Sequence, residues 1–118
     1  MKFITIFKSA ARQFAEVPDE NTIAEMRKLI HEMRGKGVLV DTGGVVPAGA
    51  SMRVRRNGNN VAVTDGPFTE TKELVGGFAV LEVSSKDEAL SWTRRFLEIG
   101  GDEFSEIHEV SPTPFTDD

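Results

Sequence analysis

Apolar residues recur along this chain at two different spacings, and these predict its strands and helices. Met1 to Lys8 reads M-K-F-I-T-I-F-K and carries mostly apolar side chains on both faces of a strand. Phe78 to Val83 has the same character. A strand that is apolar on both faces needs cover on both sides. Alternating segments predict further strands at Val38 to Thr42, Met52 to Arg56, Val61 to Asp65 and Phe104 to Val110.

Two other segments carry apolar residues at helical spacing. Thr22 to Arg34 begins with a capping box formed by Thr22 and Glu25. Ser85 to Ile99 begins with a second capping box, formed by Ser85 and Glu88. The expected buried stripes are Ile23, Met26, Ile30 and Met33 in the first helix, and Ala89, Trp92, Phe96 and Ile99 in the second.

The order of these elements predicts the fold. It reads strand, helix, strand, hairpin, strand, helix, strand, with Asn57-Gly58-Asn59-Asn60 as the hairpin turn. This is the split β-α-β arrangement of a ferredoxin-like α+β fold with an added β-hairpin. We expect one domain over residues 1–110 and a mobile C-terminal tail over residues 111–118.

The two helices can cover only one face of the sheet, so the second apolar face needs another partner. The same face of a second copy is the economical candidate, because it makes an isologous homodimer with two sheets packed together. The pattern therefore predicts a dimeric α+β barrel.

Composition narrows the class of protein. The chain has 118 residues, 39% hydrophobic and 28% charged, as in an ordinary soluble globular domain. It contains no cysteine, which excludes disulfides and thiolate chemistry and favours a cytoplasmic location. A net charge of -5 argues against a nucleic-acid partner, and no run is long and apolar enough for a membrane partner. We expect no cofactor.

The stretch from Thr64 to Phe78 is the candidate site, because it joins two strands and concentrates turn residues and charges. With the segment from Gly43 to Gly49 it would form a cleft for an unknown small molecule. Asp65 or Glu73 would act as acid or base, and Lys72 would neutralise developing negative charge. The expected ligand-binding residues are Arg53, which would orient an anionic group, Asp41, Gly66 and Phe68.

A purely structural interpretation of this stretch stays open. Asp65 can cap its own turn by accepting hydrogen bonds from backbone amides, and Lys72 and Glu73 can simply be solvated. Similarly, Arg53 lies on an outer strand face where charges commonly block edge association.

The two histidines give weak signals. His31 lies near Arg27 and Arg34 on the polar side of the first helix, which favours a solvated residue over a ligand. Glu106 and His108 share one face of the last strand, but two possible ligands do not make a metal site. We therefore expect no metal.

The run Asp65-Gly66-Pro67-Phe68, followed by Glu70, Lys72-Glu73 and Gly77-Phe78, resembles the signature of the YCII-related family in its DGPF-domain branch. The similarity extends over nearly the whole chain. The resemblance implies a ferredoxin-like dimeric α+β barrel, in agreement with the hydrophobic pattern. It also implies suspected enzyme activity in the wider family, based on a His and Asp pair in a cleft.

This sequence departs from the family pattern at three positions. Asp41 carries the acidic group that related proteins have where Gly43 stands, and Leu29 stands where an aromatic residue is usual. Because His31 lies on the polar helix face, no His and Asp pair is transferred to this chain.

Two function classes follow. The first is a small-molecule-binding protein or a cofactor-free acid–base enzyme. The second is a non-catalytic accessory or regulatory protein that binds another protein, since the branch is often linked to extracytoplasmic-function sigma factors.

Overall fold

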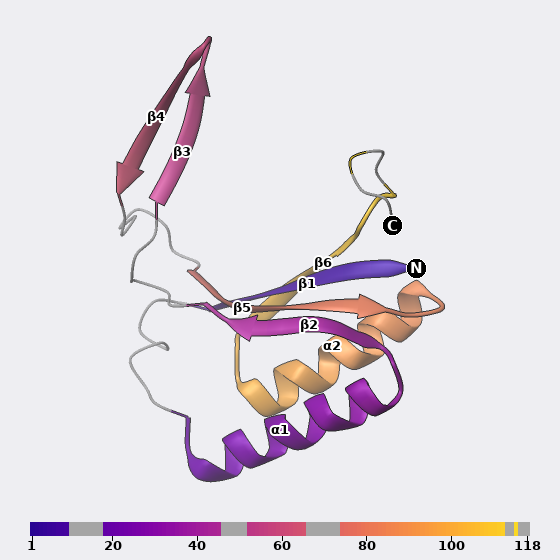
Figure 1. The fold of residues 1–118 in the computed structure, drawn as a ribbon. Coiled ribbons are helices and arrows are strands. Elements are labelled where there is room, and N and C mark those ends of the chain that lie inside the picture. The colour runs from indigo at the N-terminus through magenta and orange to yellow at the C-terminus, as the bar shows by residue number, and fades with distance from the viewer. Residues whose placement is uncertain (10–17, 46–51, 66–73, 113–114, 116–118) are drawn as a thin grey trace.

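The computed structural model describes residues 1–9, 18–45, 52–65, 74–112 and 115. A four-stranded sheet lies beside two helices, and a separate two-stranded hairpin projects from it (Figure 1). In chain order the elements are β1 (Lys2–Ser9), α1 (Glu20–Gly35), β2 (Leu39–Gly44), β3 (Met52–Asn57), β4 (Asn60–Asp65), β5 (Leu74–Glu82), α2 (Lys86–Gly100) and β6 (Phe104–Glu109).

The strand order confirms the ferredoxin-like prediction. The main sheet runs β2-β5-β1-β6, and every neighbouring pair is antiparallel. Both helices lie on one face of this sheet, and within the described ranges no helix covers the other face (Figure 1). The expected dimer stays a prediction.

The core lies between the sheet and the two helices. Phe3, Phe7 and Leu81 point from the strands into it, and each has at most 5% of its surface exposed. Leu29 and Met33 contribute the buried face of α1. α2 contributes Ala89, Thr93 and Phe96, with Trp92 and Ile99 half-buried beside them.

The predicted stripe of α1 is wrong at Ile23, which is 38% exposed. At 100° per residue, Leu29 and Met33 lie on the side of the helix that faces the core, and Ile23 lies on its flank. Met26 and Ile30 occupy the boundary and are half-buried. The apolar surface of α1 is therefore wider than its buried surface.

Both helix starts show how caps decide element ends. α1 begins at Glu20, not at Thr22, because the Asp19 carboxylate accepts a hydrogen bond from the Thr22 amide at 2.7 Å. The predicted Ser85 cap of α2 is confirmed, with Ser85 Oγ accepting from the Glu88 amide at 3.1 Å. The Glu88 carboxylate bonds the Ser84 amide and hydroxyl, however, and so differs from the expected capping box.

The two helices are joined by a bidentate ion pair. The Arg95 guanidinium donates to both carboxylate oxygens of Glu32, at 2.7 and 3.0 Å. These hydrogen bonds hold the pKa of the Glu32 carboxyl below its ordinary value. The pair fixes α1 against α2.

Within the described residues, no helix is long and apolar enough to cross a membrane.

Two strands that contain glycines are longer than predicted, β2 at its end and β5 at its start. β2 continues through Gly43 and Gly44, which pair with Phe78 and Gly77 of β5. A Cβ atom at Gly77 would lie 2.9 Å from the Gly43 carbonyl oxygen, too close for any side chain. β5 consequently begins at Leu74, four residues before the prediction.

The predicted hairpin is confirmed. β3 and β4 pair from Met52 and Asp65 to Asn57 and Asn60. Gly58 takes a φ of 65° at the first turn position, which is the glycine position of a type II′ turn.

Candidate functional site

A groove of about 580 Å³ lies between α1 and the part of the sheet where β2 ends. This volume is in the range of small-molecule sites. Its lining has an apolar floor, a cationic rim and a strand margin. The described lining residues are Phe7, Met26, Arg27, Ile30, His31, Arg34, Thr42, Gly43, Gly44, Phe78 and Phe96.

The floor of the groove is continuous with the core. The Phe7 and Phe96 rings contact each other at a centroid distance of 5.3 Å and an angle of 39°. Both side chains are buried, whereas Met26 and Ile30 are half-buried beside them. This floor can receive the apolar body of a ligand, because burying such surface gains about 25 cal/mol per Å².

The rim carries three basic side chains from α1. Arg27, His31 and Arg34 stand at helical positions i, i+4 and i+7, and all three are exposed. Within the described residues, none of them makes an ion pair or a side-chain hydrogen bond. The lining given by these residues contains no carboxylate. The rim therefore presents positive charge and hydrogen-bond donors that are available to an anion.

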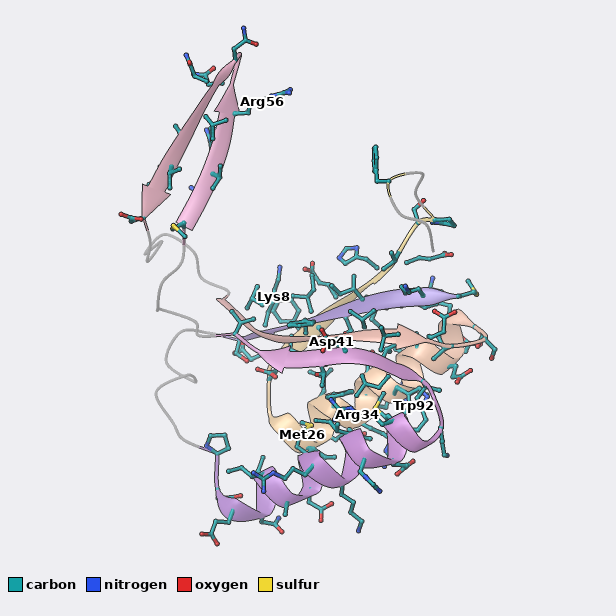
Figure 2. All side chains as sticks on the ribbon, in the orientation of Figure 1. Lys8, Met26, Arg34, Asp41, Arg56 and Trp92 are labelled. Carbon is teal, nitrogen blue, oxygen red and sulfur yellow. The ribbon has the colours of Figure 1, made fainter. Side chains whose placement is uncertain are left out.

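Helical geometry explains why cations border an apolar floor. Going round α1, the surface changes from the buried Leu29 and Met33 to Met26 and Ile30, and then to the three basic residues. Figure 2 shows Met26 and Arg34 on the helix side of the sheet. The boundary between the core face and the solvent face of α1 thus forms one wall of the groove.

The strand margin is held by backbone contacts. Thr42 Oγ1 donates a hydrogen bond to the Phe78 carbonyl oxygen at 2.8 Å, which fixes the edge strand β2 to β5. Gly44 pairs with the buried Gly77, so a side chain at position 44 would point to the helix side of the sheet. Only a carbonyl oxygen at 3.9 Å would contact a Cβ atom there. The absence of a side chain at Gly44 helps to keep the groove open.

Three predicted site residues lie outside this groove. Asp41 pairs with Val80 on the sheet face away from the helices and does not line the groove, and its carboxylate accepts a hydrogen bond from the Thr42 amide at 2.9 Å. Arg53 is exposed on β3, and Asp65 is exposed at the end of β4. The structure does not bring these three residues together into the groove.

The other predicted residues, Gly66, Phe68, Lys72 and Glu73, lie outside the described residues. The prediction of a site at the stretch from Asp65 to Glu73 therefore stays a prediction.

Sequence reasoning missed Arg27 and Arg34 as site residues and placed His31 only on the polar face of its helix. His31 is indeed exposed, but the polar face borders the groove at its edge. The available signal was three basic residues on one side of a helix, combined with Gly43 and Gly44 on the strand that follows it. Helical periodicity alone separates core from solvent and cannot identify a groove between them.

Apart from the groove, a partly buried polar cluster joins β1 to the turn before β6. Ser9 Oγ donates to Asp102 at 3.1 Å and accepts from the Glu103 amide at 3.0 Å. Burial raises the pKa of the Asp102 carboxyl, and the Ser9 hydrogen bond opposes that rise. The satisfied bonds indicate a structural role.

Among the described residues, no group of three or more His, Cys, Asp or Glu side chains could hold a metal ion.

Comparison with known proteins gives three findings. The family described as the YCII-related domain matches residues 1–107. An uncharacterized protein, R00369, of Rhizobium meliloti (strain 1021) is 30% identical over 87 residues, which are 74% of this chain and 70% of that protein. The 5-chloro-2-hydroxyhydroquinone dehydrochlorinase TftG of Burkholderia phenoliruptrix AC1100, solved in complex with 2,5-dihydroxybenzoquinone, has a similar fold. That comparison has a TM-score of 0.55 and 16% identity, and it covers 99% of this chain and 100% of TftG.

Proposed function

The chain belongs to the YCII-related domain family, and from this premise we propose that it binds a small anionic molecule in the groove between α1 and β2. The observation that carries the proposal is the rim of Arg27, His31 and Arg34, which faces a hollow apolar floor without a carboxylate among its described lining. In a chain of net charge -5, such a local excess of positive charge favours an anionic ligand.

The floor and the rim together define the ligand class. A carboxylate, phenolate or phosphate would accept hydrogen bonds from the two guanidinium groups, which suit planar anions in particular. An aromatic or branched apolar body would pack on Phe7, Met26 and Phe96. The likeness to TftG supports the fold, and at 16% identity it transfers no substrate to this chain.

A cofactor-free acid–base reaction is the catalytic form of this proposal. Among the described lining residues, His31 is the side chain suited to both accept and donate a proton. Arg27 and Arg34 would stabilise negative charge that develops on the ligand. The stretch from Asp65 to Glu73 remains our second candidate for acid–base groups, and binding at the groove does not depend on it.

We also propose that the protein is a homodimer. The sheet face away from the helices, here called the open face, has Ile4, Ile6, Phe78 and Val80 at its centre. Charges surround this centre, including Lys8 paired with Glu106 at 2.7 Å. Packing this face against its counterpart in a second copy would bury the apolar centre.

Benzoate is a suitable first probe for the groove, with neutral benzamide as its matched analogue. We expect benzoate to bind in the millimolar range and benzamide more weakly. Replacing Arg27→Gln together with Arg34→Gln should raise the benzoate Kd at least about 10-fold, because hydrogen bonds to charged groups contribute about 1.5–3 kcal/mol each. Binding can be measured by NMR chemical-shift titration.

Three further variants locate the site. Arg94→Gln removes an exposed arginine of α2 outside the groove and should leave the benzoate Kd unchanged. Gly44→Leu should fill the groove and weaken the binding of both probes. Gly35→Leu is its control, because it adds the same side chain at a position where nothing lies within 4 Å of the Cβ atom. Equal benzoate affinity in the wild type and in the Arg27 and Arg34 double variant would refute the proposed site.

A further inference from the structure

The hairpin of β3 and β4, here called the arm, is exposed along its whole length. All residues from Met52 to Asp65 are exposed. An isolated two-stranded hairpin is marginally stable in water and needs a further packing surface. Neither face of the hairpin is therefore covered by another described layer of the same protomer.

One face of the arm gathers its large apolar side chains. The register pairs Val54 with Val63, and Met52 and Val61 lie on the same side, flanked by Asp65, which pairs with Met52, and Arg56, which pairs with Val61. These four side chains are 60–65% exposed. The opposite face carries Arg53, Arg55, Ala62 and Thr64. Clustering of the large apolar side chains on one face indicates a contact surface, because exposed apolar residues of a monomer are normally scattered.

The arm stands on the side of the sheet that a second copy would occupy. In Figure 1 the helices lie on one side of the four-stranded sheet and the arm extends on the other. The Cα radius of gyration is 16.1 Å, whereas a compact domain of this length has about 13.5 Å. The arm thus projects from the body of its protomer on the side of the open face.

Charge also favours a second copy over an unrelated partner. The arm contains three arginines and one aspartate, a net charge of +2, whereas the whole chain has -5. The rest of the protomer therefore carries -7. A basic arm and an acidic body attract each other across a two-fold axis, and each protomer supplies both surfaces.

Interface size gives a third argument. Four strands about 4.8 Å apart and about 20 Å long present a footprint of roughly 400 Å² on the open face. A stable interface buries about 800 Å² per partner. One arm face adds roughly 200 Å², and each protomer gives one arm and receives another, which supplies about the missing 400 Å².

From these observations we infer that the arm packs its apolar face, Met52, Val54, Val61 and Val63, on the body of a second copy, so that each protomer of the dimer clasps the other. This inference rests on the proposed dimer and adds a second contact to it. The occupant of the apolar arm face is a second copy of this chain.

Sedimentation equilibrium of matched variants tests the inference. Val54→Asp with Val63→Asp places two charges on the apolar arm face and should raise the dimer dissociation constant about 100-fold, the loss typical of central interface residues. Ala62→Asp with Thr64→Asp adds the same charge to the opposite face and should change it less than about 5-fold. Far-UV circular dichroism checks that each variant is folded.

Cross-linking locates the contact, because the chain has no cysteine of its own. A benzophenone attached to Val63→Cys should give a covalent dimer on illumination, and the same label on Thr64→Cys should give much less. A stable wild-type dimer with equal dissociation constants for both double variants, or with cross-links only inside one chain, would overturn the arm contact and leave the open-face dimer standing. A monomeric wild type would overturn both.

Discussion

The two faces of the four-stranded sheet come from the same strands and differ in what covers them. On the helix side, Phe3, Thr5 and Phe7 of β1 are at most 5% exposed. On the open face, Ile4 and Ile6 of the same strand are only half-buried. Because side chains alternate along a strand, this difference arises from the covering layer and not from the residue types.

The difference also separates the two binding surfaces that we propose. The helix layer ends at β2, where a hollow groove leaves Arg27 and Arg34 without anionic partners among the described residues. The open face instead balances its charges, with Lys8 bonded to Glu106 and the Met1 amino group 3.7 Å from Glu82. A groove bordered by positive charge suits a small anion. A sheet face on which opposite charges pair with each other suits a second copy of the chain.

Adjacent residues of β5 offer the largest test of this comparison. Leu81→Ala on the helix side should lower the free energy of unfolding by about 2–5 kcal/mol, since it leaves a cavity in the core. Val80→Ala on the open face should lower it by about 1 kcal/mol or less in dilute protein and should weaken dimerisation instead. Urea unfolding at low and high protein concentration separates the two effects. Equal losses at both concentrations would show that the two faces do not differ.

A smaller effect is expected from the buried hydroxyl of Thr5. Its Oγ1 atom has no hydrogen-bond partner among the described residues, although the side chain is fully buried. Thr5→Val should therefore raise the free energy of unfolding by about 1 kcal/mol, because it removes an unsatisfied polar group.

Thr42→Val is the matched control for Thr5, since the Thr42 hydroxyl does donate to the Phe78 carbonyl. This variant should be less stable than the wild type. A lower melting temperature in both variants would mean that the Thr5 hydroxyl has a hydrogen-bond partner in solution.

The smallest effect concerns the open-face ion pair. The hydrogen bond from Lys8 holds the pKa of the Glu106 carboxyl below its ordinary value of 4.5. The pair therefore stabilises the folded state above pH 4.5, and this contribution is lost as the pH falls through the lowered pKa. Glu106→Gln should be slightly less stable than the wild type at pH 7 and equally stable at strongly acidic pH.

Glu109→Gln provides the comparison for Glu106, because Glu109 is exposed and has no ion pair within the described part of the chain. Its stability should follow the wild type at both pH values. A stability difference for Glu106→Gln that persists in strong acid would exclude the ion pair as its cause.

Local signals predicted the fold well. The Asn57-Gly58 turn, the Ser85 cap and the first strand, β1, each depend on neighbouring residues, and each is confirmed. The start of α1 was missed because Asp19 competes with Thr22 for the cap and forms the stronger contact.

The groove could not be predicted in the same way. Arg34 of α1 and Gly44 of β2 become neighbours of one hollow only after the chain turns between helix and strand. The charged loop residues Lys72 and Glu73 led to a predicted site in a different part of the chain. The groove instead depends on the polar side of α1 and on glycines of β2, which have no side chain.

The molecular mass in solution tests the central claim most directly, because the open face, the arm and the homodimer all depend on a second copy. Sedimentation equilibrium at micromolar concentration should give about 26 kDa, twice the 13.0 kDa of one chain. A mass of 13.0 kDa that persists as the protein concentration rises would contradict the account.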